Sequence, residues 1–185
     1  SLRQVLPALR RALMRTVALV ETLDAAEHMT AEVAAADVVI LAGGGTRGQE
    51  AALKALAERL DAPVIQTVNA RGMMHHHPLT VPASPSLSSV RDLIHSADRV
   101  LAIGTEFGWT DYDMYVVGDL PARADTIRID ACAEQLARLP AALTLHGDAG
   151  ATMAALLPHL AAKHGSGPAR AAATRSSVSA RRSSR

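Results

Sequence analysis

The sequence predicts an α/β fold: a doubly wound, mostly parallel sheet of five or six strands with helices on both faces, in the Rossmann-like arrangement. The first observation is a series of short apolar runs, each bounded by charged residues or glycine, which is typical of strands buried on both faces. The second is that segments with apolar residues at helical spacing separate these runs. Because parallel strands need a crossover connection, this alternation indicates right-handed βαβ units.

Length and composition restrict the class of protein. The 185 residues favour one main domain, and 49% hydrophobic with only 2% aromatic residues imply an aliphatic core. A net charge of +1 gives no global electrostatic reason to expect a nucleic-acid partner. The single cysteine, Cys132, excludes an intramolecular disulfide and fits a reducing compartment. With no apolar run of about 18 residues and no signal peptide at the start, we expect a cytoplasmic protein without a membrane partner.

The most informative stretch is a predicted buried strand followed by glycines. Five apolar residues at 38–42 come directly before Gly43, Gly44 and Gly45, and an amphipathic helix over about 51–60 follows. Glycine allows the backbone to turn tightly and to approach a ligand, and the free N–H groups at a helix start favour phosphate or another anion. Two interpretations remain open: a phosphate-binding loop, or a tight turn that permits close packing of the helix.

The same turn contains the pattern G-x-G-x-x-G, at Gly43, Gly45 and Gly48. Dinucleotide binding also requires an acidic residue about 20 residues further on, to bind the ribose. The second predicted strand, residues 63–68, leads into Asn69 and ends without a carboxylate. A stand-alone NAD-dependent Rossmann-type enzyme is therefore the alternative hypothesis, and the spacing assigns no catalytic residue to it.

The later strands and helices continue the alternation. The strands are predicted at 98–104, 124–130 and 142–146, and the helices over 86–97, around 134–136 and over 149–163. Asp148 is expected to be the N-cap of the last helix, because Asp accepts hydrogen bonds from the free amides of a helix start.

The loop predicted over residues 69–85 contains three consecutive histidines, residues 75–77. Three consecutive residues do not all face one metal ion from a regular element, and no second cluster of ligands accompanies them. We therefore interpret the segment as a polar loop and predict no metal site.

Polar residues follow two of the later strands at their C-terminal ends, the edge at which α/β sheets bind ligands. Gly104, Thr105 and Glu106 lie at the end of the 98–104 strand, and Asp130 ends the next one. Asp130 is suited to bind ribose hydroxyls or to cap the helix that follows. The only Phe, the only Trp and one of the two Tyr lie within residues 105–113, where they either contact a ligand or plug the loop onto the sheet.

The sequence divides into three parts. Residues 1–29 form an N-terminal helical segment or linker, with leucines and valines at helical spacing. Residues 30–164 form the central α/β domain. Residues 165–185 are rich in Ser, Ala and Arg and contain no acidic residue, which favours a disordered basic tail.

The order of motifs resembles the central domain of thiamine-diphosphate-dependent enzymes of the acetolactate synthase and 2-oxo acid decarboxylase family. The resemblance covers roughly residues 33–162, and its strongest pieces lie at the predicted strand ends. They are Val38-Val-Ile-Leu-Ala-Gly-Gly-Gly45, Thr67-Val-Asn-Ala-Arg-Gly72, His77-Pro-Leu79, Ala97-Asp-Arg-Val-Leu-Ala-Ile-Gly-Thr105, Ile127-Arg-Ile-Asp130 and Gly147-Asp148. The segment Thr110-Asp-Tyr-Asp113 is similar to the branch of 5-guanidino-2-oxopentanoate decarboxylase-like enzymes.

The resemblance implies that this chain is the middle domain of a lyase or transferase and is inactive alone. Enzymes of the family have three domains, of which the first supplies a catalytic glutamate and the third holds thiamine diphosphate through Mg²⁺ with a Gly-Asp-Gly motif. Here Gly118-Asp119 is followed by Leu and Gly147-Asp148 by Ala, so that motif is missing. No catalytic residue is therefore assigned. The implied partners are the missing thiamine-binding domains and further copies of the chain.

The resemblance also allows for an adenine-nucleotide site at which no reaction takes place. Central domains of the family bind FAD, ADP or CoA, or nothing. The FAD-binding members usually carry a Gly-Met-His-Gly-like stretch where this chain reads Val81-Pro-Ala-Ser-Pro-Ser86, which argues against FAD. The positions that match the nucleotide-facing edge of the family are Gly43, Gly44, Gly45, Gly104, Thr105, Glu106 and Asp130.

Overall fold

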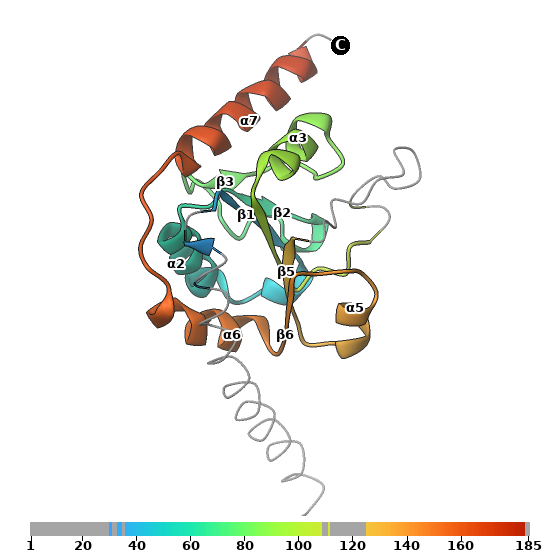
Figure 1. Cartoon of the computed structure of the whole chain (residues 1–185). Helices are drawn as coiled ribbons and strands as arrows, with labels where there is room; N and C mark the ends of the chain where they lie inside the picture. The colour runs from blue at the N-terminus through green and yellow to red at the C-terminus, as the bar shows by residue number, and fades with distance from the viewer. Residues whose placement is uncertain (1–29, 31–32, 35, 109–110, 112–124, 184–185) are drawn as a thin grey trace, which may run out of the picture.

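The computed structural model describes residues 30, 33–34, 36–108, 111 and 125–183 (Figure 1). The helical segment expected within residues 1–29 lies outside this range. In the described part of the chain no helix combines the length and the apolar character that a membrane crossing requires.

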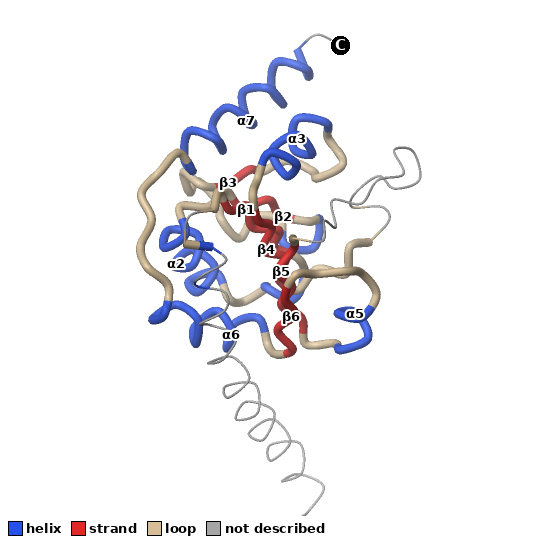
Figure 2. The backbone as a smooth tube through the Cα atoms, in the orientation of Figure 1, coloured by secondary structure: helices blue, strands red, loops and turns tan. Residues whose placement is uncertain are grey.

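Six strands form one sheet in the order β3-β2-β1-β4-β5-β6, and every neighbouring pair is parallel (Figure 2). The strands are β1 (Val38–Ala42), β2 (Val64–Gln66), β3 (Thr80–Val81), β4 (Arg99–Ile103), β5 (Thr126–Asp130) and β6 (Leu143–His146). The predicted doubly wound parallel sheet is therefore confirmed. The prediction missed β3, which has two residues and lies in the segment expected to be a loop.

Helices connect the strands and cover both faces of the sheet (Figure 1). The α-helices are α2 (Glu50–Leu60), α3 (Ser88–Ser96), α5 (Ala133–Ala137), α6 (Ala149–Leu156) and α7 (Gly167–Ser183). Three single turns of 3₁₀-helix are η1 (Gly44–Thr46), η2 (Val68–Ala70) and η3 (Leu157–His159). Asp148 is the N-cap of α6, as predicted, and its side chain accepts a hydrogen bond from the Ala151 amide.

The core has two halves because successive side chains of a strand point to opposite faces. On β1, Val38, Ile40 and Ala42 pack with residues of α2 and α6, whereas Val39 and Leu41 pack with residues of α3 and α7. All five are at most 1% exposed. A strand buried on both faces reads as a continuous apolar run, which is why its position was predictable from the sequence.

The C-terminal segment differs from its prediction, because residues 167–183 form α7 instead of a disordered tail. Ala171, Thr174 and Val178 recur at helical spacing and are buried or partly buried on the side of α3 and β3. The segment is rich in alanine, which has the highest helix propensity, and the apolar face of α3 gives it a surface to cover. Composition alone indicated disorder because this buried face has few large apolar residues.

The end of α2 holds the connection between α6 and α7. The Asp61 carboxylate accepts hydrogen bonds of 2.9 Å from both the Gly165 and the Gly167 amides. The Arg59 side chain donates to the Leu160 carbonyl at 2.9 Å. These contacts lead the chain from the α2 and α6 side of the sheet to the start of α7.

Strand β3 is an edge strand, and an arginine of α7 covers part of its edge. Nη1 of Arg175 donates to the carbonyl oxygens of Pro78 at 2.9 Å and of Thr80 at 2.7 Å. Residues two apart on a strand direct their carbonyls to the same side, so one guanidinium nitrogen reaches both. An exposed strand edge is a template for pairing with another chain, and this contact blocks it.

Candidate functional site

The turns after β1 and β4 meet through their backbones at the C-terminal edge of the sheet. The Gly43 amide donates to the Ile103 carbonyl at 2.9 Å, and the Gly45 amide donates to the Gly104 carbonyl at 3.0 Å. A Cβ on Gly43 would lie 2.2 Å from the Gly104 oxygen, and one on Gly45 would lie 2.8 Å from the Gly104 Cα. Glycine is therefore required at these positions for packing, with or without a ligand.

This contact lies where the order of strands reverses, between β1 and β4. In open α/β sheets that reversal is the usual place for a ligand, because the loops on either side diverge. Here the two loops are in direct backbone contact instead. A nucleotide would have to lie beside this contact and not between the two turns.

The start of α2 also differs from the expected anion site. The helix begins at Glu50 and not directly after the glycines, because η1 and a turn intervene. The Gly48 amide donates to the Glu50 carboxylate at 3.3 Å. An acidic side chain thus occupies the first turn, where the free amides of a helix favour negative charge.

A polar hollow of about 600 Å³ lies between the turns after β1 and β2. We call it the β1–β2 hollow, and its lining residues are Arg47, Gly48, Glu50, Val68, Asn69, Arg71, Gly72 and Met73. Gly44 borders this region, because a Cβ there would lie 3.2 Å from the Asn69 Cβ. The two arginines outnumber the one carboxylate, Glu50, which already accepts from the Gly48 amide, so the hollow is suited to an anionic ligand.

The sequence analysis did not assign Arg47, Asn69 or Arg71 to a site. The available signal was their position, since all three follow a strand end that faces the ligand-binding edge of the sheet. Their side-chain types alone did not distinguish them from ordinary loop residues.

The remaining candidates do not line the β1–β2 hollow. Thr105 is 4% exposed, and its Oγ1 accepts a hydrogen bond from the Phe107 amide at 3.4 Å. Glu106 is exposed. The Asp130 carboxylate accepts from the Cys132 amide at 2.9 Å, so it orders the turn before α5 while Cys132 holds the N-cap position.

Phe107 supports the interpretation that the aromatic residues after β4 plug the sheet. It is 1% exposed and has a positive φ of 52°. The Arg128 guanidinium, itself buried, lies 5.1 Å from the centre of the Phe107 ring and donates to the Leu136 carbonyl at 3.2 Å. Such a cation–π contact stabilises a buried arginine. Trp109 and Tyr112 lie outside the described residues.

The described residues do not fit thiamine diphosphate and Mg²⁺. They contain no group of three or more His, Cys, Asp or Glu that would hold a metal ion. In the pair Gly147-Asp148, the carboxylate is engaged at 2.9 Å by the Ala151 amide. The pair Gly118-Asp119 lies outside the described residues.

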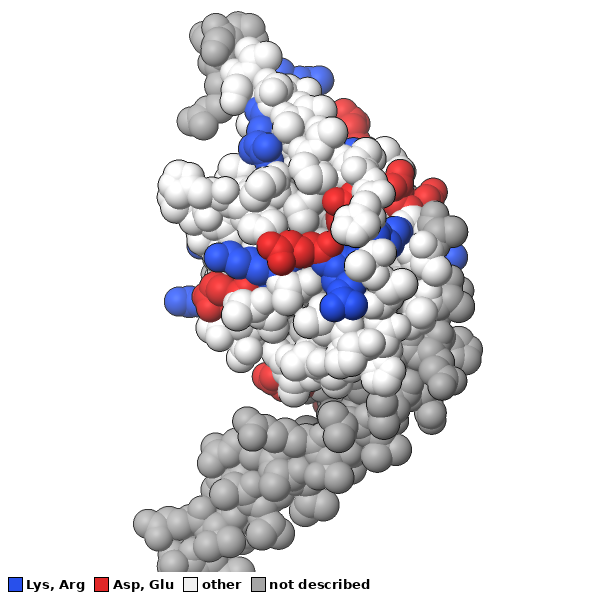
Figure 3. Space-filling model, turned by 90° about the vertical axis from the view of Figure 1, so that its left-hand side faces the viewer, with Lys and Arg blue, Asp and Glu red and all other residues white. Residues whose placement is uncertain are grey.

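The charge on the face seen in Figure 3 is mixed. On the face in Figure 3, basic and acidic side chains alternate in a band and form no large area of one sign. One local effect lies at α5, where the Cys132 thiol donates to the Glu134 carboxylate at 3.1 Å. This bond, followed by the backbone of Glu134 and the charge of His146, holds the pKa of Glu134 below its ordinary value.

Known proteins match the chain along most of its length. The family model described as "Thiamine pyrophosphate enzyme, central domain" matches residues 24–156. A Pseudomonas aeruginosa protein described as a probable 2-ketoarginine decarboxylase is 36% identical over 129 residues, which are 69% of this chain and 22% of that protein. The chain thus spans about a fifth of the length of this relative.

Solved structures share the fold. An enzyme from Mycobacterium smegmatis, described as thiamin diphosphate-dependent, matches with a TM-score of 0.63 and 25% identity over 76% of this chain and 28% of that chain. Benzoylformate decarboxylase from Polynucleobacter necessarius matches with a TM-score of 0.64 and 19% identity over 78% of this chain and 28% of that chain. The order of motifs, the sheet topology and these matches all point to the same family. The chain belongs to the family of thiamine pyrophosphate enzyme central domains.

Proposed function

We propose that the chain serves as the structural middle domain of a thiamine-diphosphate-dependent 2-oxo acid decarboxylase and binds an adenine nucleotide in the β1–β2 hollow. The observation that carries the nucleotide proposal is the pair of arginines, Arg47 and Arg71, in a polar hollow at the C-terminal edge of the sheet. Each follows a different strand, so together they approach an anionic group from two sides. Arginine is the residue best suited to paired hydrogen bonds with phosphate oxygens.

We expect ADP rather than FAD, because residues 81–86 lack the stretch that FAD-binding members usually carry. The hollow has a volume of about 600 Å³, within the range of roughly 300–1,000 Å³ that is usual for small-molecule sites. The contact of Gly43 and Gly45 with Gly104 closes the neighbouring space between β1 and β4. Gly43, Gly44 and Gly45 belong to the turn that leads to Arg47.

Binding is tested by thermal denaturation of the purified chain with ADP, FAD, CoA, NAD, or thiamine diphosphate plus Mg²⁺. A ligand at 100 times its Kd adds about 2.7 kcal/mol to the free energy of unfolding, which shifts the midpoint measurably. We expect a shift with ADP. A shift with NAD alone would favour the alternative, a stand-alone NAD-dependent enzyme. A shift with thiamine diphosphate would contradict the assignment of that cofactor to the missing domains.

Variants locate the nucleotide. Arg47→Gln and Arg71→Gln should each weaken ADP binding about tenfold in calorimetric titration, because each removes a charged hydrogen-bond donor. Arg138→Gln is the matched control, since this exposed arginine is the C-cap of α5 and does not line the hollow. Equal weakening by all three variants would indicate a general charge effect and contradict the proposed site.

We propose further that the parent enzyme acts on 2-ketoarginine, which is the compound also named 5-guanidino-2-oxopentanoate. The support is the 36% identity to a protein described as a probable decarboxylase of this compound. The chain alone should release no CO₂ from 2-ketoarginine with thiamine diphosphate and Mg²⁺, whereas a full-length enzyme carrying this domain should. Release by the chain alone would contradict its role as a non-catalytic domain.

A further inference from the structure

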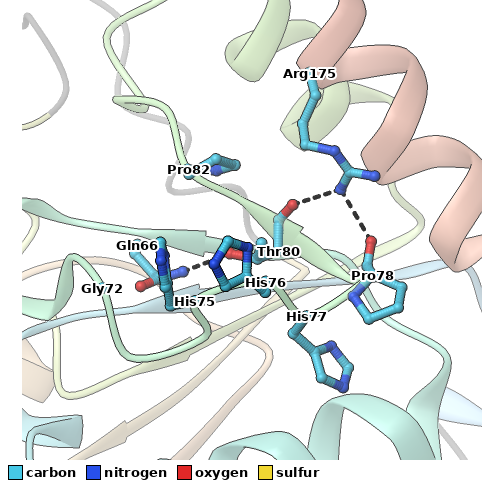
Figure 4. Close-up of a pocket in the computed structure, with 9 residues that line it drawn as sticks. All are labelled: Gln66, Gly72, His75, His76, His77, Pro78, Thr80, Pro82 and Arg175. Atoms are coloured by element: carbon cyan, nitrogen blue, oxygen red, sulfur yellow. Dashed lines mark hydrogen bonds between the residues drawn. The ribbon is translucent and has the colours of Figure 1, made fainter.

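A second cavity, of about 370 Å³, lies beside the edge strand β3 and does not depend on the proposed nucleotide site (Figure 4). Its lining residues are Gln66, Gly72, His75, His76, His77, Pro78, Thr80, Pro82 and Arg175. They come from the end of β2, from the loop of residues 72–78 that holds the three histidines, from β3 and the residue after it, and from α7. Arg175 is the residue that α7 contributes to this lining.

Gln66 supplies a buried hydrogen-bonding atom without a partner. The residue is 3% exposed, and its Nε2 donates to Thr80 Oγ1 at 2.7 Å. Its Oε1 is buried and accepts no hydrogen bond. An unsatisfied buried acceptor costs about 1–3 kcal/mol, so such atoms are rare unless something binds them. The orphan oxygen is therefore placed to accept a hydrogen bond from a donor in the cavity.

The rest of the lining is cationic or neutral. None of the nine residues that line the cavity is acidic. Arg175 lies at one end, where the Pro78 and Thr80 carbonyls hold its Nη1 and thereby fix the position of the guanidinium. A guanidinium has five N–H donors, of which Nη1 carries two, so this anchoring is compatible with binding an anion.

Two histidines form the other side of the cavity. The rings of His75 and His76 lie 3.9 Å apart, and His76 has a positive φ of 61°. Figure 4 shows both rings next to the Gln66 amide, whereas His77 turns away toward α2, where its Nε2 lies 3.0 Å from the Glu58 carboxylate. Non-glycine residues rarely have a positive φ, and those that do occur often at functional sites.

We propose that this cavity binds a phosphate group that retains a proton. The phosphate oxygens would accept hydrogen bonds from the Arg175 guanidinium and from the imidazoles of His75 and His76. The P–OH group would donate to the orphan Oε1 of Gln66. Gln66 Oε1 is a buried acceptor without a hydrogen bond in this lining, so it favours protonated phosphate over an anion without a proton.

Sulfate is the matched control ligand, because it has the same shape and carries no proton near neutral pH. Calorimetric titrations of the full chain with phosphate and with sulfate, at about pH 6 where a phosphate group still holds a proton, measure the selection. We expect phosphate to bind about tenfold more tightly than sulfate, as for one hydrogen bond to a charged group. A third titration, with glycerol phosphate, compares a phosphate ester with inorganic phosphate. Tighter binding of glycerol phosphate would identify an ester as the natural ligand, and tighter binding of inorganic phosphate would identify the free ion.

Gln66→Met removes the acceptor at nearly constant volume. We expect it to lower phosphate affinity about tenfold and leave sulfate affinity unchanged, which abolishes the selection. Arg175→Gln should lower the affinity for both phosphate and sulfate. Arg138→Gln, at the C-cap of α5, and Arg181→Gln, elsewhere on α7, are the charge controls and should leave both affinities within about twofold of the original.

Equal binding of phosphate and sulfate, or equal losses in the control variants, would overturn the proposal. If Arg175→Gln loosens α7, the side-chain amide resonances of Gln66 in the original chain remain a test. They are identified by their absence in Gln66→Met, and they should shift with phosphate but not with sulfate. The absence of any shift at saturating phosphate would also overturn the proposal.

Discussion

Glycines at the C-terminal edge of the sheet differ in what prevents a side chain. Gly104 has a φ of +56°, and a Cβ there would lie 2.6 Å from the Gly45 Cα. Gly48 has a φ of +78° but no atom within 4 Å of such a Cβ. Backbone strain alone therefore acts at Gly48, whereas strain and a backbone clash act together at Gly104.

This difference predicts unequal effects of alanine. Gly48→Ala should lower the free energy of unfolding by about 1 kcal/mol, from the left-handed backbone conformation alone. Gly104→Ala should lower it by about 3 kcal/mol, because the clash with the Gly45 backbone adds to the strain. Urea denaturation of both variants measures the difference, and equal losses would contradict the steric role of the β1–β4 contact.

The Cys132 thiol predicts a pH effect at Glu134. A folded-state pKa below the unfolded value gives stability that is present above the unfolded pKa and is lost as pH falls through the folded pKa. Cys132→Ala should raise the pKa of Glu134 toward its ordinary value, as followed by ¹³C NMR of the carboxyl group. Cys132→Ser keeps a donor and is the control; an unchanged pKa in the alanine variant would assign the effect to the backbone or to His146.

At the scale of elements, α7 depends on a narrow buried face. Ala171 is 0% exposed and packs in the core half that contains Val39 and Leu41. Ala171→Asp should detach the helix, at a cost of about 3 kcal/mol, because an unpaired buried charge is not tolerated. Hydrogen exchange of the α7 amides measures the detachment. Ala180→Asp, at an exposed position of the same helix, should leave the exchange rates unchanged.

Some of the strands and helices could be predicted from the sequence, and others could not. β1 and β4 were predicted because they are buried on both faces and read as nearly continuous apolar runs. In β5 the two isoleucines alternate with Thr126, Arg128 and Asp130, which is also a strand pattern. β3 was missed because two residues carry no periodicity, and its place is determined by pairing with β2. α7 was missed because its buried face consists of small residues, so the burial depends on the neighbouring α3.

The candidate site was predictable only in part, for a related reason. Gly43, Gly45 and Gly104 were correctly placed at one edge, because parallel strands end on the same side of a sheet. Their direct contact depends on the path of two turns, which no local pattern specifies. The β1–β2 hollow and the cavity beside β3 depend on side chains from separate segments, so neither was evident from spacing along the chain.

Considered as a whole, the isolated domain is expected to self-associate through exposed apolar surface. The described part of the chain exposes two large hydrophobic residues, Val68 at 57% and Leu87 at 42%. Val68 borders the β1–β2 hollow, so an interface there would compete with the nucleotide. Multi-angle light scattering over a range of concentrations should show a dimer that ADP weakens. A monomer at every concentration would contradict the expectation.

The contact of Arg175 with the edge of β3 forms late in the synthesis of the chain. Its carbonyl partner at Thr80 precedes it by 95 residues, and the partner at Pro78 precedes it by 97. At a synthesis rate of about 5–20 residues per second, the ribosome takes on the order of ten seconds to supply the arginine after the strand has been made. During that interval the nascent sheet presents an uncovered edge, so chaperone binding should be strongest to chains stalled between these two points.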